Sequence, residues 1–284
     1  MRKALRWRVV WFIGLFLLWL LCSGSVLAGT LSDRLSQFPD WQTKPMVQSA
    51  TGDLVYPDWI AGDWTVTTTL LDMAAPLAPN ITTPGFESNE QYLNQPITFQ
   101  VRFVEQQPRL NGIFSSLRSL VRGQKQIVAD RAFNGQNLAE AYLGDRAVLS
   151  VRVDPNNPNR QITLLQGDRQ LVSTVTGRAT ETPDPDQFVT TEIFQQMFRG
   201  APQLYFNEVE TTTAYQRHAP DQDAEPIISA DQVTAIYLSP QDPDYFKVGD
   251  IPVALYRYRL EFSPADPTDL DPGELTHANT LFPI

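Results

Sequence analysis

The feature that most constrains the fold is an alternation of apolar and polar residues with a period of two. Trp64, Val66 and Leu70 lie at alternate positions among threonines, and the segment 97–103 repeats the pattern. A period of two places one set of side chains on a buried face, which is typical of β-strands. The residues involved are largely β-branched or aromatic, which favours strands. The pattern predicts nine strands, at residues 64–70, 97–103, 126–133, 147–153, 160–166, 170–180, 203–217, 231–239 and 252–262.

Helical spacing is confined to short segments. Leu31, Leu35 and Phe38 share one helical face just before Pro39, and a proline ends a helix. Three more short helices are predicted at residues 113–121, 134–143 and 190–198, each followed within two residues by a glycine. A glycine directly after the last periodic residue is a typical helix stop.

The balance of these elements predicts an all-β fold. Many short strands with few helices and frequent turns are typical of a barrel or a sandwich. We expect a single antiparallel β-barrel of roughly eight to ten strands with a few short helices, and a β-sandwich is the alternative. The predicted divisions are a signal peptide at 1–28, an N-terminal entry segment at 29–62, the barrel domain at 63–263 and an irregular C-terminal tail at 264–284.

The first 28 residues predict export. Four basic residues precede an apolar run from Val9 to Leu21, and small residues lead to Ala28. This order is typical of a cleavable signal peptide. The run is shorter than the ~20 residues that a membrane-spanning helix needs. We expect cleavage after Ala28, and an uncleaved N-terminal anchor is the alternative.

Composition excludes two classes of function for the mature chain. Removing the four basic residues of the signal leaves 18 Lys and Arg against 32 Asp and Glu, a net charge of −14. So acidic a chain repels nucleic-acid phosphates, whose binding depends on clustered Lys and Arg, so we expect no nucleic-acid partner. Cys22, the single cysteine, lies in the signal. The mature chain therefore has no disulfide, thiol catalyst or thiolate metal site.

Candidate catalytic groups are few. His218 and His277 lie in polar segments flanked by proline and aspartate, and the chain has no Gly-x-Ser-x-Gly motif. Glu208 and Glu210 are two residues apart on one expected strand, so they share a face. Inside a barrel such a pair serves acid–base chemistry, but we expect both to face water. We expect no catalytic residue, metal or cofactor.

One segment is basic in an otherwise acidic chain. Residues 101–131 hold six basic and two acidic residues. A basic amphipathic helix is suited to an anionic membrane surface. Arg118, Arg122 and Lys125 are therefore candidates for contact with a membrane or a partner, and the alternative is a helix packed on the barrel.

The sequence Gly62-Asp63-Trp64 resembles the lipocalin and broader calycin pattern. The resemblance implies a Trp at the closed end of a barrel, covered by a cation from near the last strand, a contact of roughly 0.5–2 kcal/mol. Arg257 and Arg259 are the candidates, and we favour Arg259. We expect Trp41, in the entry segment, to matter much less for stability than Trp64.

Residues 54–64 and 206–213 are similar to an uncharacterised cyanobacterial and plastid family of calycin-like lumenal proteins. The resemblance implies a thylakoid lumen or a periplasm, and it implies no activity. We therefore expect a non-catalytic protein that binds a small apolar ligand, such as a lipid or pigment, or that assists a membrane protein complex. The alternative is a calycin-type enzyme that acts on a pigment or lipid.

Overall fold

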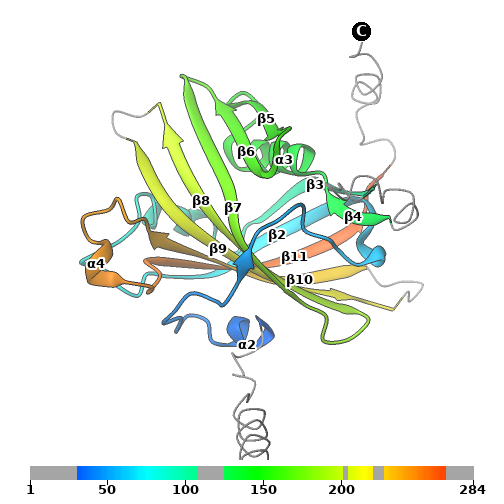
Figure 1. Ribbon diagram of the computed structural model, residues 1–284, viewed down its shortest axis with the longest axis horizontal. Coiled ribbons are helices and arrows are strands. Elements are labelled where there is room, and N and C mark those ends of the chain that lie inside the picture. Colours follow the sequence, from blue (N-terminus) through cyan, green and yellow to red (C-terminus); the bar gives the residue numbers. More distant parts are fainter. Residues whose placement is uncertain (1–30, 108–124, 201–203, 220–226, 267–284) are drawn as a thin grey trace, which may run out of the picture. The chain divides into compact units, whose positions relative to one another are not determined.

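A computed structural model describes residues 31–107, 125–200, 204–219 and 227–266 (Figure 1). The expected signal peptide, the helix expected at 113–121 and nearly all of the C-terminal tail lie outside these residues. Within them, no helix is long and apolar enough to cross a membrane.

The described chain forms one curled antiparallel sheet rather than the two sheets of a sandwich. Ten strands follow the order β4-β3-β2-β11-β10-β9-β8-β7-β6-β5, so the expected all-β, barrel-like fold is confirmed. Their bounds are β2 Gly62–Ala74, β3 Pro96–Gln106, β4 Gln126–Ala129, β5 Val148–Asp154, β6 Asn157–Leu165, β7 Arg169–Glu181, β8 Gln187–Arg199, β9 Tyr205–Arg217, β10 Ile228–Leu238 and β11 Ala254–Pro264.

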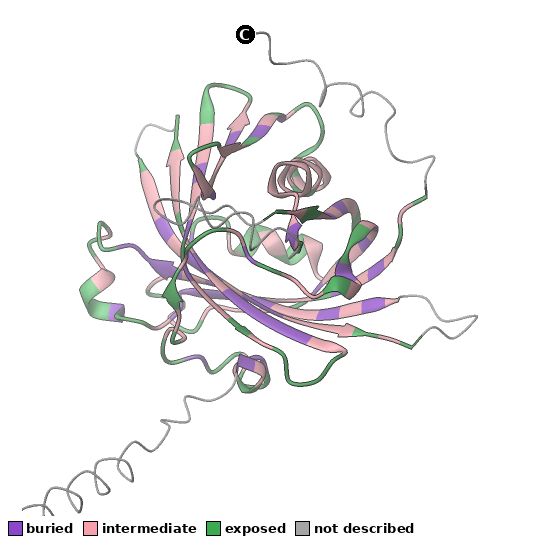
Figure 2. Cartoon of the chain, turned by 45° about the vertical axis from the view of Figure 1, so that its right-hand side comes forward, coloured by how far each residue is buried: buried purple, intermediate pink, exposed green. Residues whose placement is uncertain are grey.

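The side chains that alternate in the sequence form the core of the fold. Trp64, Val66, Thr68 and Leu70 are all buried along one face of β2. The neighbouring strand β11 places Phe262 opposite Val66 in the ladder. Because directly opposite residues of an antiparallel pair share a face, these side chains build one common interior. Figure 2 shows the buried residues following the central strands.

Strand β8 corrects one expectation, since residues 190–198 were expected to form a helix. In β8, Phe188, Val189, Thr190 and Thr191 are consecutive and all buried. Further along the strand, Ile193-Phe194 and Met197-Phe198 place apolar side chains on both faces. Apolar residues on both faces remove the period-two alternation by which a strand is recognised. The outer face of β8 is covered by an N-terminal helix, α2 (Leu31–Ser36).

Helix α3 (Arg131–Leu143) confirms the expected helix at 134–143 but begins earlier, inside a segment expected to be strand. The carboxylate of Asp130 accepts a hydrogen bond from the backbone N–H of Phe133 at 3.2 Å. This contact caps the helix N-terminus and so ends β4 at Ala129.

The sheet does not close on itself, and α3 spans part of the opening between β3 and β5 (Figure 1). Beyond the end of β4, the Asn134 side chain accepts from the Arg102 N–H at 2.7 Å and donates to the Arg102 carbonyl at 3.2 Å. The amide thus occupies the place of a paired strand. Together with the Asp130 N–H, which donates to the same carbonyl at 2.9 Å, it satisfies the edge of β3 at this residue.

The rest of the opening is bridged by the segment before β2. Strand β1 (Gln48–Ser49) pairs with β7, and the Tyr56 N–H donates to the Ile127 carbonyl of β4 at 2.8 Å. A 3₁₀ helix, η1 (Asp58–Ile60), then leads into β2. The entry segment is therefore part of the barrel wall.

The N-terminal segment also packs on the outer face of the sheet. Trp41 is 1% exposed, against 8% for Trp64. It packs with Leu35, Val233 and Tyr237, and the Arg34 guanidinium lies 3.9 Å from the centre of its ring. The expectation that Trp41 matters much less than Trp64 assumed an entry segment apart from the core, and this assumption is wrong, because the segment covers an apolar stretch of β10. The remaining short helices, η2 (Glu87–Tyr92) and α4 (Tyr245–Val248), lie in the β2–β3 and β10–β11 connections.

Candidate functional site

A cavity of about 580 Å³ lies inside the curled sheet. This volume is within the usual range of small-molecule sites. It is lined by the inward-facing side chains of the strands and by α3. Its main lining residues are Tyr56, Val66, Thr68, Phe99, Val101, Leu138, Tyr142, Gln161, Leu171, Ser173, Phe194, Gln196, Val209, Thr211, Tyr215, Gln232, Thr234, Tyr258, Leu260 and Phe262.

One end of the cavity is closed by packed aromatic rings. Tyr56 meets Phe103 edge to face at a centroid distance of 4.8 Å, and Tyr215 meets Phe262 at 6.0 Å. Trp64 lies beyond them, 6.4 Å from Phe262, and its indole N–H donates to the Ile60 carbonyl at 2.8 Å. Such T-shaped contacts stabilise a core beyond simple burial.

The middle of the cavity remains accessible. Phe99, Phe194 and Leu171 face inward from three strands, yet each is only partly buried. Large apolar side chains on the inner face of a sheet are normally buried completely. Their partial exposure means that the cavity presents apolar surface to a small molecule.

Helix α3 forms a loosely packed wall of this cavity. It has no buried residue, and its cavity-lining residues Leu138 and Leu143 are 42% and 55% exposed. At Gly135 the helix lies close to β6, because an added Cβ would be 2.6 Å from the Gln161 amide nitrogen. Glycine therefore sets how near the helix lies to β6.

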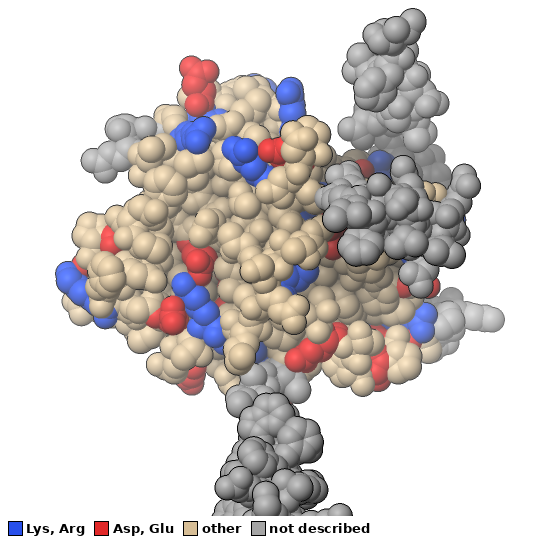
Figure 3. Space-filling model, viewed as in Figure 1, with Lys and Arg blue, Asp and Glu red and all other residues tan. Residues whose placement is uncertain are grey.

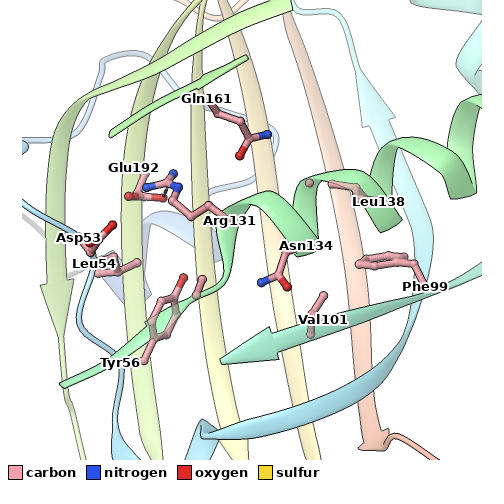
Figure 4. Close-up of a pocket in the computed structure, with 12 residues that line it drawn as sticks. Asp53, Leu54, Tyr56, Phe99, Val101, Arg131, Asn134, Leu138, Gln161 and Glu192 are labelled. Atoms are coloured by element: carbon pink, nitrogen blue, oxygen red, sulfur yellow. Dashed lines mark hydrogen bonds and ion pairs between the residues drawn. The ribbon is translucent and has the colours of Figure 1, made fainter. Parts of the chain in front are cut away.

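A smaller pocket of about 240 Å³ adjoins the cavity near the start of α3 (Figure 4). Eight of its twelve lining residues are shared with the larger cavity. Arg131 and Glu192 line it, and an Arg131 nitrogen lies 3.5 Å from a Glu192 oxygen. Arg178 binds the other Glu192 oxygen at 2.6 Å. Two guanidinium groups thus share one carboxylate beside a pocket whose wall also contains the polar side chains of Asp53, Asn134 and Gln161.

The tyrosines at this end remain protonated. Burial raises the pKa of Tyr56 well above its usual range, and the charge of Glu192 raises it further. Burial also raises the pKa of Tyr215. Because a neutral phenol is both donor and acceptor, Tyr56 offers a hydrogen-bonding group at the pocket wall. Figure 4 shows its hydroxyl on the side of the pocket where Arg131 and Glu192 lie.

The arginines expected over Trp64 lie elsewhere. Strand β11 does pair with β2, as expected, and Arg259 lies opposite Thr69 in the ladder. Thr69 and Trp64 are on opposite faces of β2, so Arg259 points away from the indole. Arg257 binds Asp231 at 2.6 Å and Arg259 binds Glu261 at 2.9 Å. The expected cation over the Trp64 ring is therefore wrong, because strand parity places both arginines outside.

Other expected site residues are placed as follows. Gly62 begins β2 with a φ of 123°, a value that favours glycine. Lys125 is exposed and pairs with Glu105, while Arg118 and Arg122 lie outside the described residues. Figure 3 shows basic and acidic side chains interspersed on the visible face of the described part.

The carboxylates expected to face water do not. Lys44 binds Glu208 at 2.6 Å. The Glu210 side chain is 0% exposed and accepts from an Arg34 Nη at 2.7 Å and from the Tyr237 hydroxyl at 2.7 Å. Both lie on the outer face of β9, under the N-terminal segment, where they serve structure.

Sequence reasoning missed the charged group inside the barrel. Arg131 was visible as one of the basic residues of 101–131. Arg178 and Glu192, however, lie on strands β7 and β8, and only their pairing in the ladder brings them together. Their sequence positions carry no signal of that contact.

The chain belongs to the family described as a domain of unknown function (DUF6816), whose model matches residues 48–266. No curated protein and no solved structure matches it. The matched region runs from β1 to just beyond β11, so it contains the sheet and the cavity, while α2 and Trp41 precede it.

Proposed function

We propose that this member of the DUF6816 family is an exported, non-catalytic binding protein that holds one small apolar or amphiphilic molecule inside the curled sheet. The observation that carries the proposal is the cavity of about 580 Å³. A ligand site is typically a concave, mostly apolar space with a few polar groups that orient the ligand. Here apolar and aromatic residues are combined with the amides of Gln161, Gln196 and Gln232.

The arrangement of the wall supports entry of such a molecule. The sheet itself is a continuous ladder of hydrogen bonds, whereas α3 spans the opening without burying any of its residues. A segment with few buried contacts opens at a lower free energy than the core strands. Helix α3 is thus the part of the wall that moves most easily to admit a ligand.

The proposal extends to family and compartment. It places the chain among calycin-like barrels of cyanobacterial and plastid origin, with the mature protein in a thylakoid lumen or periplasm. The Gly62-x-Trp64 entry at the closed end of the barrel and the predicted signal support this. N-terminal sequencing of the protein from its own host should begin at Gly29, and an intact Met1 would show that the segment stays as an anchor.

Filling the cavity should weaken binding while leaving the fold intact. Thr234 lines the cavity from β10 and is only partly buried. We expect Thr234→Phe to lower affinity for the neutral fluorescent probe N-phenyl-1-naphthylamine by about tenfold or more, because the ring occupies the ligand's volume. Fluorescence titration measures the affinity.

The matched control is Thr67→Phe, the same change on the outer face of β2. There the Thr67 hydroxyl oxygen lies 3.4 Å from the hydroxyl oxygen of Thr98. It should bind the probe like the wild type. Equal binding by the wild type and both variants would place the probe outside the cavity and contradict the proposal.

Native mass spectrometry of protein from its own host then identifies the natural occupant of the cavity. A membrane protein found bound instead of a small molecule would favour the assembly role.

A further inference from the structure

We infer that the pocket beside α3 binds the anionic head of an amphiphile, a carboxylate, whose apolar chain extends into the main cavity. This inference rests on the proposed function, since it assigns a chemical class to the molecule held there. The ligand class is a medium- or long-chain carboxylic acid in its ionised form.

The weak pairing of a withdrawn charge is the first argument. Arg131, Arg178 and Glu192 have side chains that are 17%, 11% and 12% exposed, so all three are largely withdrawn from water. With Asp53, which also lines the pocket, the two cations are balanced by two anions. Arg131 nevertheless lies 3.5 Å from Glu192, whereas Arg178 lies 2.6 Å from the same carboxylate. A ligand carboxylate at Arg131 supplies a closer partner for this withdrawn guanidinium.

The bonding of the two arginines is unequal. Arg178 is held firmly, because it donates to Glu192 through Nε at 2.9 Å and Nη2 at 2.6 Å, and also to Asn159 and the Gly52 carbonyl. Among the described residues, Arg131 is hydrogen-bonded to Glu192 alone, at 3.5 Å. A guanidinium has five N–H donors in a fork that suits a carboxylate. Arg131 is therefore the group with donors left for a ligand.

Around Arg131, polar groups lie at one end of the pocket and apolar side chains lie at the end that leads into the main cavity. Figure 4 shows Arg131, Glu192 and the Tyr56 hydroxyl on one side of the pocket, and Phe99 and Leu138 on the other. Phe99 and Leu138 also line the larger cavity, so the apolar side leads into it. A head group at Arg131 thus places its chain along apolar side chains.

One acidic residue lies at the same pocket. Asp53 lines it and is partly buried. Among the described residues, Asp53 forms no ion pair with either arginine. Arg131 therefore gains no close partner from Asp53, and its remaining donors are left for the ligand.

Competition between matched ligands tests the inference. Dodecanoate and dodecan-1-ol share one chain and differ in charge, and at about pH 8 the acid is ionised. Each is titrated against bound N-phenyl-1-naphthylamine on the purified protein. We expect dodecanoate to bind about tenfold more tightly than the alcohol, as a charge-assisted hydrogen bond implies.

Two substitutions at the pocket should move this preference in opposite directions. Arg131→Gln should remove it, so that the acid and the alcohol bind this variant with equal affinity. Glu192→Gln should increase it, because the change removes the carboxylate that competes with the ligand for Arg131. Arg259→Gln, which alters an exposed arginine on the outer face, should leave it unchanged.

Two results would overturn the inference while leaving the binding function standing. One is equal affinity of the wild type for the acid and the alcohol. The other is a preference for the acid that survives Arg131→Gln. Failure of the probe and both ligands to bind the wild type would instead contradict the proposed function itself, so the two failures are distinguishable.

Discussion

Replacing Trp41 by alanine should lower the free energy of unfolding by about 3–5 kcal/mol, the usual cost of removing a buried large aromatic side chain. The indole is 1% exposed and packs on the outer face of β10. Its N–H donates to the Arg34 carbonyl at 2.8 Å, and the Arg34 guanidinium lies over its ring. The substitution therefore removes a hydrophobic contact, a hydrogen bond and a cation–π contact together. Chemical denaturation followed by circular dichroism measures the change.

Trp59→Ala is the matched control, since Trp59 is only partly buried, in η1. The decrease in the free energy of unfolding should be clearly smaller for this variant, because the destabilisation scales with the contacts removed. Equal losses at the two positions would mean that the N-terminal segment does not hold the outer face in solution.

Replacing Arg34 by methionine should destabilise the fold by about 3–5 kcal/mol, because it leaves the buried charge of Glu210 without its cation. Glu210 is 0% exposed on its side chain. Burial lowers the pKa of Arg34, and the hydrogen bond and charge of Glu210 raise it by more, so the guanidinium stays charged. Burial and the charge of Glu210 raise the pKa of Tyr237, so its hydroxyl stays protonated and donates to the carboxylate.

Arg257→Met is the control for this prediction. Arg257 and Asp231 also form an ion pair on the outer face, but their side chains are 36% and 37% exposed. Ion pairs of that exposure contribute about 0–1 kcal/mol. Adding Glu210→Gln to Arg34→Met should recover part of the lost stability, because the uncompensated charge is removed. If stability does not recover in this double-mutant cycle, the Glu210 carboxylate does not remain buried and uncompensated in Arg34→Met, which contradicts the prediction.

The class of fold was accessible from the sequence because its signal is local. Alternation along β2 and β3 depends on which face of each strand is buried, and one buried face is enough to produce it. The start of α3 was predicted three residues too late. In the sequence nothing distinguishes Asp130 from other polar residues, and only its hydrogen bond with the Phe133 N–H identifies it as the cap. Strand β8 was missed because Ile193-Phe194 and Met197-Phe198 place apolar side chains on both faces, which leaves no alternation.

The candidate site depended on the tertiary structure. The pairing of β2 with β11 was predicted, but only the register showed that Arg259 lies opposite Thr69 and hence outside. The contact of Arg178 and Glu192 joins neighbouring strands, and Arg131 reaches it from α3 across the opening of the sheet. The sequence by itself determined an acidic, cysteine-poor chain that alternates into strands, because composition and period act within a few residues. Curvature, register and the packing of the N-terminal segment decided which charges are buried, because burial is set by what covers a residue from elsewhere in the chain.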